Sequence, residues 1–178
     1  MSANCIKNEV KLRPIYSEHQ SHRINFDGVV NFCYDSTPAL CNSYVQGFRA
    51  GTIEAVDTNL FLEENGKKTI PSTTFEKDLI AAVDKYLKFQ ESFGIVPPIF
   101  VMVSLLDVKG YSLGIKRDYR ASTINPIDRN VLLLPEIIVE EYKNNTAALL
   151  RPAFDAVWQA SGFLRSGNYD ANGNWTAK

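Results

Sequence analysis

SYVQGFRAGTIEAVD, residues 43–57, contains two short alternating runs of apolar and polar residues on either side of Gly51. Alternation with a period of two is typical of a half-buried antiparallel hairpin. If the two residues before Gly51 form the centre of a type I turn and Gly51 takes the left-handed bulge position, Gln46 faces Glu54 across the hairpin. The stretch therefore predicts a hairpin with Arg49 on its turn and Glu54 on a half-solvated face.

The neighbouring segments predict a strand before this hairpin and a long helix after it. INFDGVVNFCY, residues 24–34, is rich in β-branched and aromatic residues, and an Asp-Gly pair interrupts it with a bulge or an early turn. Apolar residues recur at helical spacing over residues 74–93, and Thr73 with Glu76 matches a capping box. We expect the apolar stripe of this helix to pack in the core.

The second half of the chain predicts three further strands. IFVMVSLL, residues 99–106, is a nearly continuous apolar run, which favours a strand that is buried on both sides. Residues 107–110 turn the chain into a strand over 111–115, and we expect these two strands to form a second hairpin beside the first. Another strand follows over 131–139, where Pro135 cannot donate a ladder hydrogen bond and so marks an edge or a bulge.

A final helix is predicted over residues 151–161, because Pro152 suits a first helical turn and Gly162 suits a C-terminal cap. The order of elements is then βββα-βββα, with hairpins as the main connections. We therefore expect an α+β fold with a mainly antiparallel sheet of about six strands and two principal helices. A doubly wound parallel sheet would need a helix between most strands.

Length and composition fit a single domain with two irregular ends. The 178 residues are 45% hydrophobic, which is enough for one core. Residues 1–23 are polar and have no clear period, so they predict an irregular N-terminal arm. Residues 24–165 form the predicted domain, and residues 166–178 form a turn-rich C-terminal tail.

Charge and cysteine content limit the compartment and the classes of partner. Lysine and arginine number 19 against 20 acidic residues, so the chain has no overall basic field for nucleic acid. Residues 1–15 contain no apolar stretch of signal-peptide length, and nowhere do about 18 apolar residues run together. Cys5, Cys33 and Cys41 are irregularly spaced, which suits reduced thiols. We expect a cytoplasmic protein without membrane or nucleic-acid partners.

Motifs for cofactors and metals are sparse. GxxxxGK[ST] and GxGxxG loops are absent, so no nucleotide cofactor is predicted. His19 and His22 have the spacing of a metal-binding pair, but the predicted arm offers no third ligand. We therefore assign neither a cofactor nor a metal site.

One constellation would support catalysis. Asp107 and Lys109 follow a predicted strand, as the acid and the lysine of metal-dependent nucleases do, and Glu54 and Asp57 are upstream acids on strands. Together these four residues would form the site of a metal-dependent nucleic-acid enzyme. The alternative interpretation is that DVKG is only a hairpin turn and that Glu54 faces solvent. We favour this alternative, in which the chain has no catalytic residues.

The predicted C-terminal tail offers candidates for binding. FLRSGNYDANGNW places Phe163, Tyr169 and Trp175 in a polar segment, where an Asn-Gly pair predicts a tight turn. Either Trp175 packs on the final helix as a lid on the core, or these aromatic residues form a contact patch for another domain or a second copy. Tyr169 and Trp175, with Arg49 at the first hairpin, are the candidate binding residues.

Five phrases, taken in order, resemble a known family: FRAGTIEAVD, FEKDLI, PPIFVMVSLLDVKGYSLG, PIDRNVLLLPEIIVE and LLRPAFDAVWQASGF. They are similar to the C-terminal region of bacterial Schlafen/AlbA-type proteins, which are described as ATP-binding proteins or transcriptional regulators. The resemblance covers residues 40–175 and includes no part of the AlbA domain, to which the nucleic-acid or nucleotide function is attributed. It implies an accessory domain that senses a small ligand or contacts another protein domain or a second copy, and it transfers no functional residue.

Overall fold

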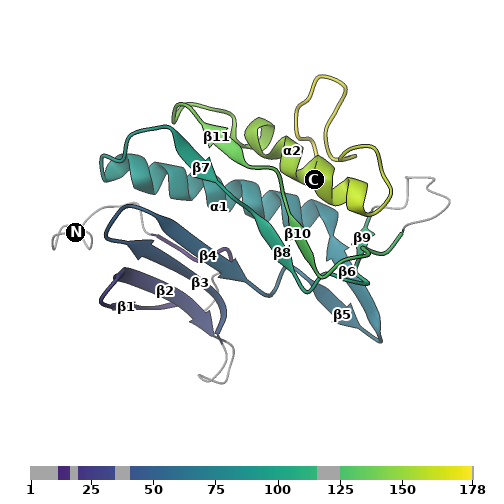
Figure 1. Ribbon diagram of the computed structural model, residues 1–178, viewed down its shortest axis with the longest axis horizontal. Coiled ribbons are helices and arrows are strands. Elements are labelled where there is room, and N and C mark those ends of the chain that lie inside the picture. The colour runs from purple at the N-terminus through teal and green to yellow at the C-terminus, as the bar shows by residue number, and fades with distance from the viewer. Residues whose placement is uncertain (1–11, 17–19, 35–40, 116–124, 178) are drawn as a thin grey trace. The chain divides into compact units, whose positions relative to one another are not determined.

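The structure is a computed structural model (Figure 1), and it describes residues 12–16, 20–34, 41–115 and 125–177. These residues form the predicted α+β fold, with two helices and mostly antiparallel strands. The described residues form eleven strands rather than about six, because the strands predicted over 99–106 and 131–139 are each broken in two. The strands Gln20–Ile24, Leu62–Glu64 and Lys67–Pro71 were not predicted from the sequence.

The chain divides into two compact units, where composition predicts one domain. The first unit comprises Met1–Asn59 with Ala81–Val96, and the second comprises Leu60–Ile80 with Pro97–Lys178. Helix α1 (Ser72–Ser92) crosses this division, so its N-terminal part belongs to the second unit and its C-terminal part to the first.

The first unit is built on a four-stranded antiparallel sheet in the order β1-β2-β3-β4. The early interruption predicted in the first strand is a turn, which joins β1 to β2. The four strands are β1 (Gln20–Ile24), β2 (Gly28–Tyr34), β3 (Cys41–Phe48) and β4 (Ile53–Asp57).

The hairpin of β3 and β4 confirms the predicted register and turn. Gln46 pairs with Glu54. Gly51 has a φ of +91°, and its N–H donates to the carbonyl of Phe48 at 2.9 Å. A Cβ atom on Gly51 would lie 2.4 Å from Cδ1 of Ile95, so that side chain would have to shift, while the positive φ itself favours glycine.

The core of the first unit joins the sheet to α1 and to part of the predicted arm. Leu12, Val45 and Phe89 are buried together. Because Leu12 is in the core and β1 begins at Gln20, residues 12–16 and 20–23 belong to the first unit rather than to an irregular arm. The polar strand β1 has no hydrophobic period, which is why the sequence gives no sign of it.

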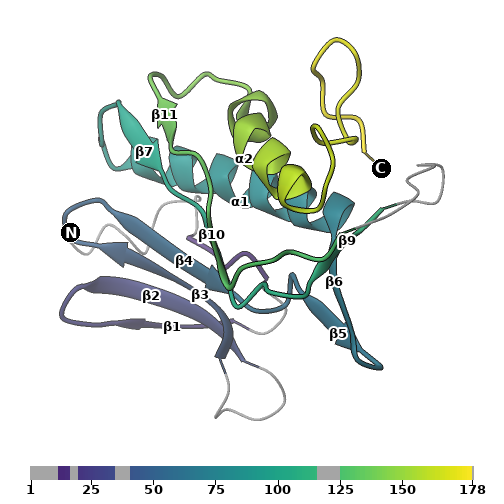
Figure 2. The ribbon, with the colours of Figure 1, turned by 45° about the vertical axis from the view of Figure 1, so that its right-hand side comes forward.

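The second unit contains two short ladders, a three-stranded sheet and helix α2 (Thr146–Ala160) (Figure 2). β8 pairs with β10 and β7 with β11, both antiparallel, while β6 lies between β5 and β9. The strands are β5 (Leu62–Glu64), β6 (Lys67–Pro71), β7 (Ile99–Val101), β8 (Ser104–Leu106), β9 (Ser112–Gly114), β10 (Val131–Leu133) and β11 (Ile137–Val139).

The predicted second hairpin is wrong. β9 does not return along β8 but pairs in parallel with β6. The residues of the DVKG turn bond to a later segment instead: the N–H of Val108 donates to the carbonyl of Asn130 at 3.1 Å, and that of Gly110 to Ile127 at 2.9 Å. Val108 is fully buried, which directs the chain away from β8.

β7 and β8 continue one another along one side of a long two-stranded ribbon, and β10 and β11 continue along the other (Figure 1). We call residues 99–106 and 131–139 the ribbon. Ser104 pairs with Leu133 and Val101 with Ile137. Val101 and Ser104 are three residues apart in the sequence, whereas their partners are four residues apart. The extra residue makes a bulge at Pro135, which confirms that prediction.

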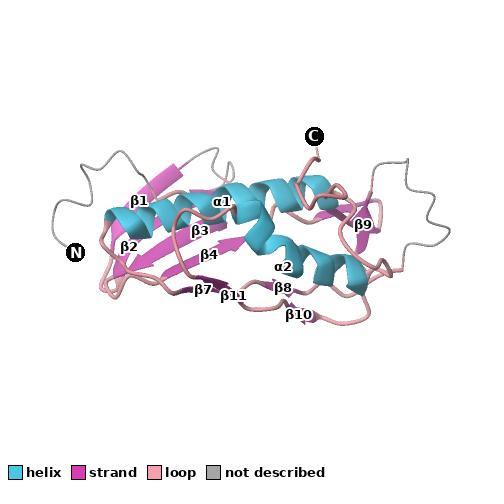
Figure 3. Ribbon diagram, turned by 90° about the horizontal axis from the view of Figure 1, so that it is seen from above, coloured by secondary structure: helices cyan, strands magenta, loops and turns pink. Residues whose placement is uncertain are grey.

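The two helices differ from their predicted starts for separate reasons. α1 begins at Ser72, but the capping box is wrong, because the Glu76 carboxylate is engaged inside the second unit. α2 begins five residues before the predicted position, with Asn145 as its cap accepting from two backbone N–H groups, and it holds Pro152 in its interior. β11 packs against α2 (Figure 3). Neither helix combines the length and the apolar character that crossing a membrane requires, as judged over the described residues.

Candidate functional site

The ribbon has one buried and one exposed apolar side. Leu105 and Leu132, which pair with each other, are buried. The neighbouring positions point the other way because side chains alternate along strands. Six large side chains on this outer side are 45% to 78% exposed, and we call them the apolar face: Phe100, Met102, Leu106, Val131, Leu133 and Ile138.

This alternation corrects the sequence prediction for residues 99–106. The run is apolar on both sides, which favoured a strand covered on both sides. Leu105 is 5% exposed, whereas Met102 is 76% exposed, so only one side is covered within the described structure. Apolar residues therefore occupy outward positions without an internal partner.

Few polar groups interrupt the apolar face. Ser104 lies among its residues and is exposed. Glu136 is exposed and, one position before the pair of Ile137 with Val101, lies opposite Met102. A contiguous apolar surface with so little charge is unusual on a monomeric soluble protein and is typical of an interaction site.

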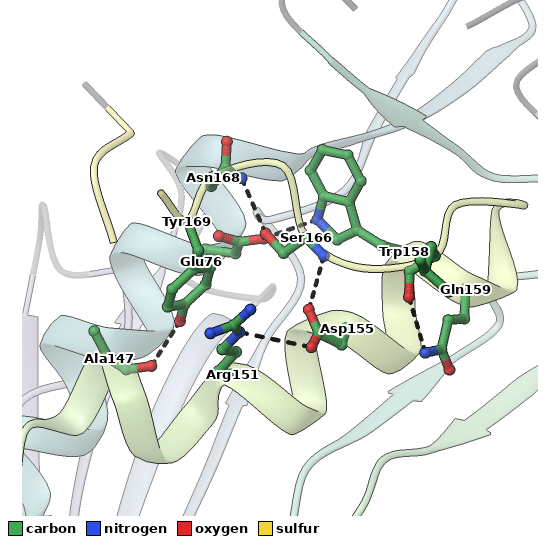
Figure 4. Close-up of polar contacts among 10 residues, drawn as sticks. Glu76, Ala147, Arg151, Asp155, Trp158, Gln159, Ser166, Asn168 and Tyr169 are labelled. Carbon is green, nitrogen blue, oxygen red and sulfur yellow. Dashed lines mark hydrogen bonds and ion pairs between the residues drawn. The ribbon is translucent and has the colours of Figure 1, made fainter. Parts of the chain in front are cut away.

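A second cluster, in the second unit, surrounds the buried carboxyl group of Glu76 (Figure 4). Its Oε1 accepts from Nε1 of Trp158 and from Oγ of Ser166, both at 2.8 Å. Its Oε2 accepts from Nε1 of Trp175, also at 2.8 Å. α1, α2 and the C-terminal segment thus meet at one side chain, which satisfies the polar groups that each brings into the core.

Tyr169 closes the same cluster from the C-terminal segment (Figure 4). Its hydroxyl donates to the carbonyl of Ala147 at 2.6 Å, and the guanidinium of Arg151 lies 5.3 Å from its ring. Burial, and then the charges of Glu76 and Asp155, raise the pKa of Tyr169. The hydroxyl therefore stays protonated over the ordinary pH range and serves as a donor.

The Asn-Gly pair forms the predicted tight turn. Tyr169 and Trp175 face each other in an antiparallel bridge. The carboxylate of Asp170 accepts from the backbone N–H groups of Asn174 and Asn172, at 2.8 Å and 2.9 Å. These bonds, that of Asn174 first, lower the pKa of Asp170. The oxygens of Asp170 thus stabilise the turn.

The three candidate binding residues have partners inside their own units. Tyr169 and Trp175 are half-buried and bond to α2 and to Glu76. Arg49 donates from Nε to the carbonyl of Phe26 at 2.9 Å, which ties the turn of one hairpin to that of the next. Each of the three thus has a structural role, and their role in binding stays a prediction.

The four residues of the hypothetical enzyme site are divided between the units. Glu54 and Asp57 belong to the first unit, and Asp107 and Lys109 belong to the second. On β4, Glu54 and Asp57 are three positions apart, so they point to opposite faces of the sheet. The strand therefore does not bring its two carboxylates together.

The two carboxylates of β4 also have different partners. Glu54 accepts from the hydroxyl of Tyr44 at 2.8 Å, and this bond is the main reason that the pKa of Tyr44 is raised. Asp57 accepts from the backbone N–H groups of Tyr16 and Asn59 at 3.2 Å and 2.8 Å. Both interactions are structural, which does not favour the enzyme hypothesis.

Of the histidines and cysteines considered in the sequence, some lie outside the described residues. His22 is exposed on β1, while His19 and Cys5 lie outside the described residues. Among the residues that are described, no three histidine, cysteine, aspartate or glutamate side chains are grouped to hold a metal ion.

The chain matches no family model, and neither the curated proteins nor the solved structures contain a match to it.

Sequence reasoning missed both the apolar face and the Glu76 cluster. An unbroken apolar run does not reveal which side a fold leaves open, because that depends on the partner strand at residues 131–139. Glu76 follows Phe75 on the apolar side of α1, and a carboxylate there was the available sign of a buried polar cluster.

Proposed function

We propose that this chain is a non-catalytic accessory domain that acts by binding another protein through the apolar face of the ribbon. The single observation that supports the proposal is the exposure of six large apolar side chains on one side of two paired strands. Water contact with such a surface is unfavourable by roughly 25 cal/mol per Å², so covering it would supply binding free energy.

The rest of the described surface offers weaker support for other sites. Leu164 is 85% exposed, but it stands alone in the loop after α2. In the first unit, Ile24 and Phe26 are exposed next to the turn between β1 and β2. Single exposed apolar residues are common on soluble proteins, whereas a contiguous face is not.

Site-specific photocrosslinking in the cells that produce the protein tests this proposal. A photoreactive phenylalanine analogue at Met102 should yield a covalent adduct of larger mass, because this side chain is central to the apolar face. The same analogue at Leu164 is the matched control, since this side chain is also highly exposed but lies in the loop after α2, outside the ribbon. We expect an adduct at position 102 that disappears when Leu133→Glu is added.

Two results would contradict the proposed function. The first is the lack of any adduct at position 102. The second is an equal yield of adducts at positions 102 and 164, which would show random collisions rather than a binding surface.

A further inference from the structure

The size of the apolar face is the first indication of which kind of partner covers it. With roughly 200 Å² of surface for a large apolar side chain, the six exposed fractions correspond to on the order of 700 Å². Stable protein interfaces bury about 800 Å² on each partner. The apolar face is thus large enough to form most of one side of such an interface.

Charge is the second guide. The described residues of the apolar face carry no charge, and Glu136 is the one ionisable side chain that points outward within the ribbon. A partner with a charged surface would therefore find almost nothing to pair with. An uncharged apolar surface, in contrast, can meet an identical surface without repulsion between like charges.

Symmetry is the third guide. Two identical faces related by a two-fold axis satisfy each other completely, because every residue that contacts is also contacted. Two-stranded ribbons stack face to face in the same way as sheets in a sandwich, with interdigitated side chains. The alternation of large residues such as Phe100, Met102 and Leu106 along one strand suits this packing.

We propose that a second copy of this chain covers the apolar face, so that the protein is a two-fold symmetric dimer. This inference rests on the proposed function, since it names the partner that binds there. A lipid surface fits less well, because the charges at the end of the ribbon are mixed. Asp107 and Lys109 are both exposed there, and Arg129 is paired with Asp128 at 2.8 Å. Binding of an apolar patch to membranes is normally helped by an excess of basic residues.

Sedimentation equilibrium of the purified full chain tests the proposal. The wild-type protein should sediment at twice its 20.0 kDa mass at micromolar concentration. Leu133→Glu should raise the dissociation constant of the dimer at least about 100-fold, because two carboxylates would be buried in the apolar interface. Leu164→Glu, the matched control away from the ribbon, should leave the dimer unchanged.

The melting temperature of each variant separates loss of association from loss of folding. Position 133 is 78% exposed, so the monomer should tolerate glutamate there. If Leu133→Glu fails to fold, Met102→Lys supplies the same readout from a position that is 76% exposed.

Several outcomes would overturn the dimer. It fails if the wild-type chain is monomeric at about 100 µM or if a wild-type dimer resists both substitutions. It also fails if the chain stays monomeric and co-sediments with phosphatidylcholine vesicles, which would identify a lipid surface. A monomeric chain that crosslinks from position 102 to a different protein would refute the dimer and leave the proposed function intact. Absence of any crosslink would refute both.

Discussion

Glu76 shows how one buried residue joins three segments of the second unit. A carboxyl group that is fully buried requires hydrogen-bond donors, since leaving it without them is strongly unfavourable. Its donors come from α2, from the loop after α2 and from the bridge near the C-terminus: Trp158, Ser166 and Trp175. The polar atoms of both tryptophans are thereby satisfied in the same place.

We predict that Glu76→Gln destabilises the protein by about 1–3 kcal/mol. Glutamine keeps one oxygen as an acceptor for Trp158 and Ser166, but it turns an N–H₂ group toward the indole N–H of Trp175. Two donors then face each other in a partly buried site. Urea unfolding followed by tryptophan fluorescence measures the loss.

Glu54→Gln is the control for this prediction. Glu54 accepts a single bond, from the hydroxyl of Tyr44, on an exposed surface. Its substitution should change the free energy of unfolding by less than about 0.5 kcal/mol. A loss for Glu76→Gln that is as small as the one expected for Glu54→Gln would contradict the prediction.

At the scale of elements, the sequence predicts those elements that are formed by interactions between neighbouring residues. The β3–β4 hairpin could be predicted because the alternation and the position of Gly51 are both contained in fifteen residues. The strand of residues 99–106 could also be identified, but its partner could not. The partner, residues 131–139, lies beyond β9 in the sequence. The chain is redirected by the buried Val108 and by the hydrogen bonds of Val108 to Asn130 and of Gly110 to Ile127.

The start of α2 illustrates a different limit. Proline favours the first turn of a helix, so Pro152 shifted the predicted start to residue 151. The Asn145 cap and the helix-forming residues after it outweigh that preference, and the helix continues through the proline. The candidate site was missed for the related reason that exposure of a strand face depends on tertiary packing.

Tyr86 links α1 to the N-terminal segment and should make the first unit sensitive to high pH. Its hydroxyl donates to the carbonyl of Arg13 at 2.9 Å. Burial, and then the charge of Asp57, raise its pKa above the ordinary value of 10.0. The unfolded chain therefore releases this proton at lower pH than the folded chain, so the stabilisation is complete below pH 10 and is lost as pH rises above it.

The test compares the wild type with Tyr86→Phe in denaturant unfolding at pH 8 to 11. Below pH 10 the variant should be less stable by about 1 kcal/mol, since it lacks the hydrogen bond. Above pH 10 the wild type should lose stability more steeply, so that the difference shrinks. A difference that stays constant over this range would contradict the raised pKa of Tyr86.

The C-terminal segment is expected to act as a lid on the second unit. Truncation after Gly167 removes Tyr169 and Trp175, and with them the bonds to Ala147 and Glu76. The truncated chain should melt several degrees lower than the full chain, because each kcal/mol lost lowers the melting temperature by roughly 2–4 °C at this size. Differential scanning calorimetry measures the shift.

Sedimentation of the same truncated chain examines the alternative, in which these aromatic residues form a contact patch. A truncated protein with an unchanged melting temperature and weakened self-association would favour the patch over the lid. Removal of only the last two residues, which leaves Trp175 in place, is the control for the effect of shortening the chain.

At the scale of the whole molecule, charge is balanced and the two units share a helix. Phe75 and Leu79 are buried in the part of α1 that belongs to the second unit, and Phe89 is buried in the part that belongs to the first. One continuous helix thus contributes to two cores. The charges of the chain nearly cancel, since 19 basic residues accompany 20 acidic ones.

We therefore predict that the full chain binds DNA no more tightly than ordinary non-specific association, with a dissociation constant of about 10⁻⁴ to 10⁻⁶ M. The reason is that phosphate binding is driven by release of counterions from the nucleic acid, which requires several lysine or arginine contacts at once. Fluorescence anisotropy with labelled duplex and single-stranded DNA at 50 mM and 200 mM salt measures both the affinity and its salt dependence. An unrelated basic DNA-binding domain in the same buffers is the positive control. Submicromolar binding that weakens steeply between the two salt concentrations would contradict the prediction and would revive the nucleic-acid enzyme hypothesis.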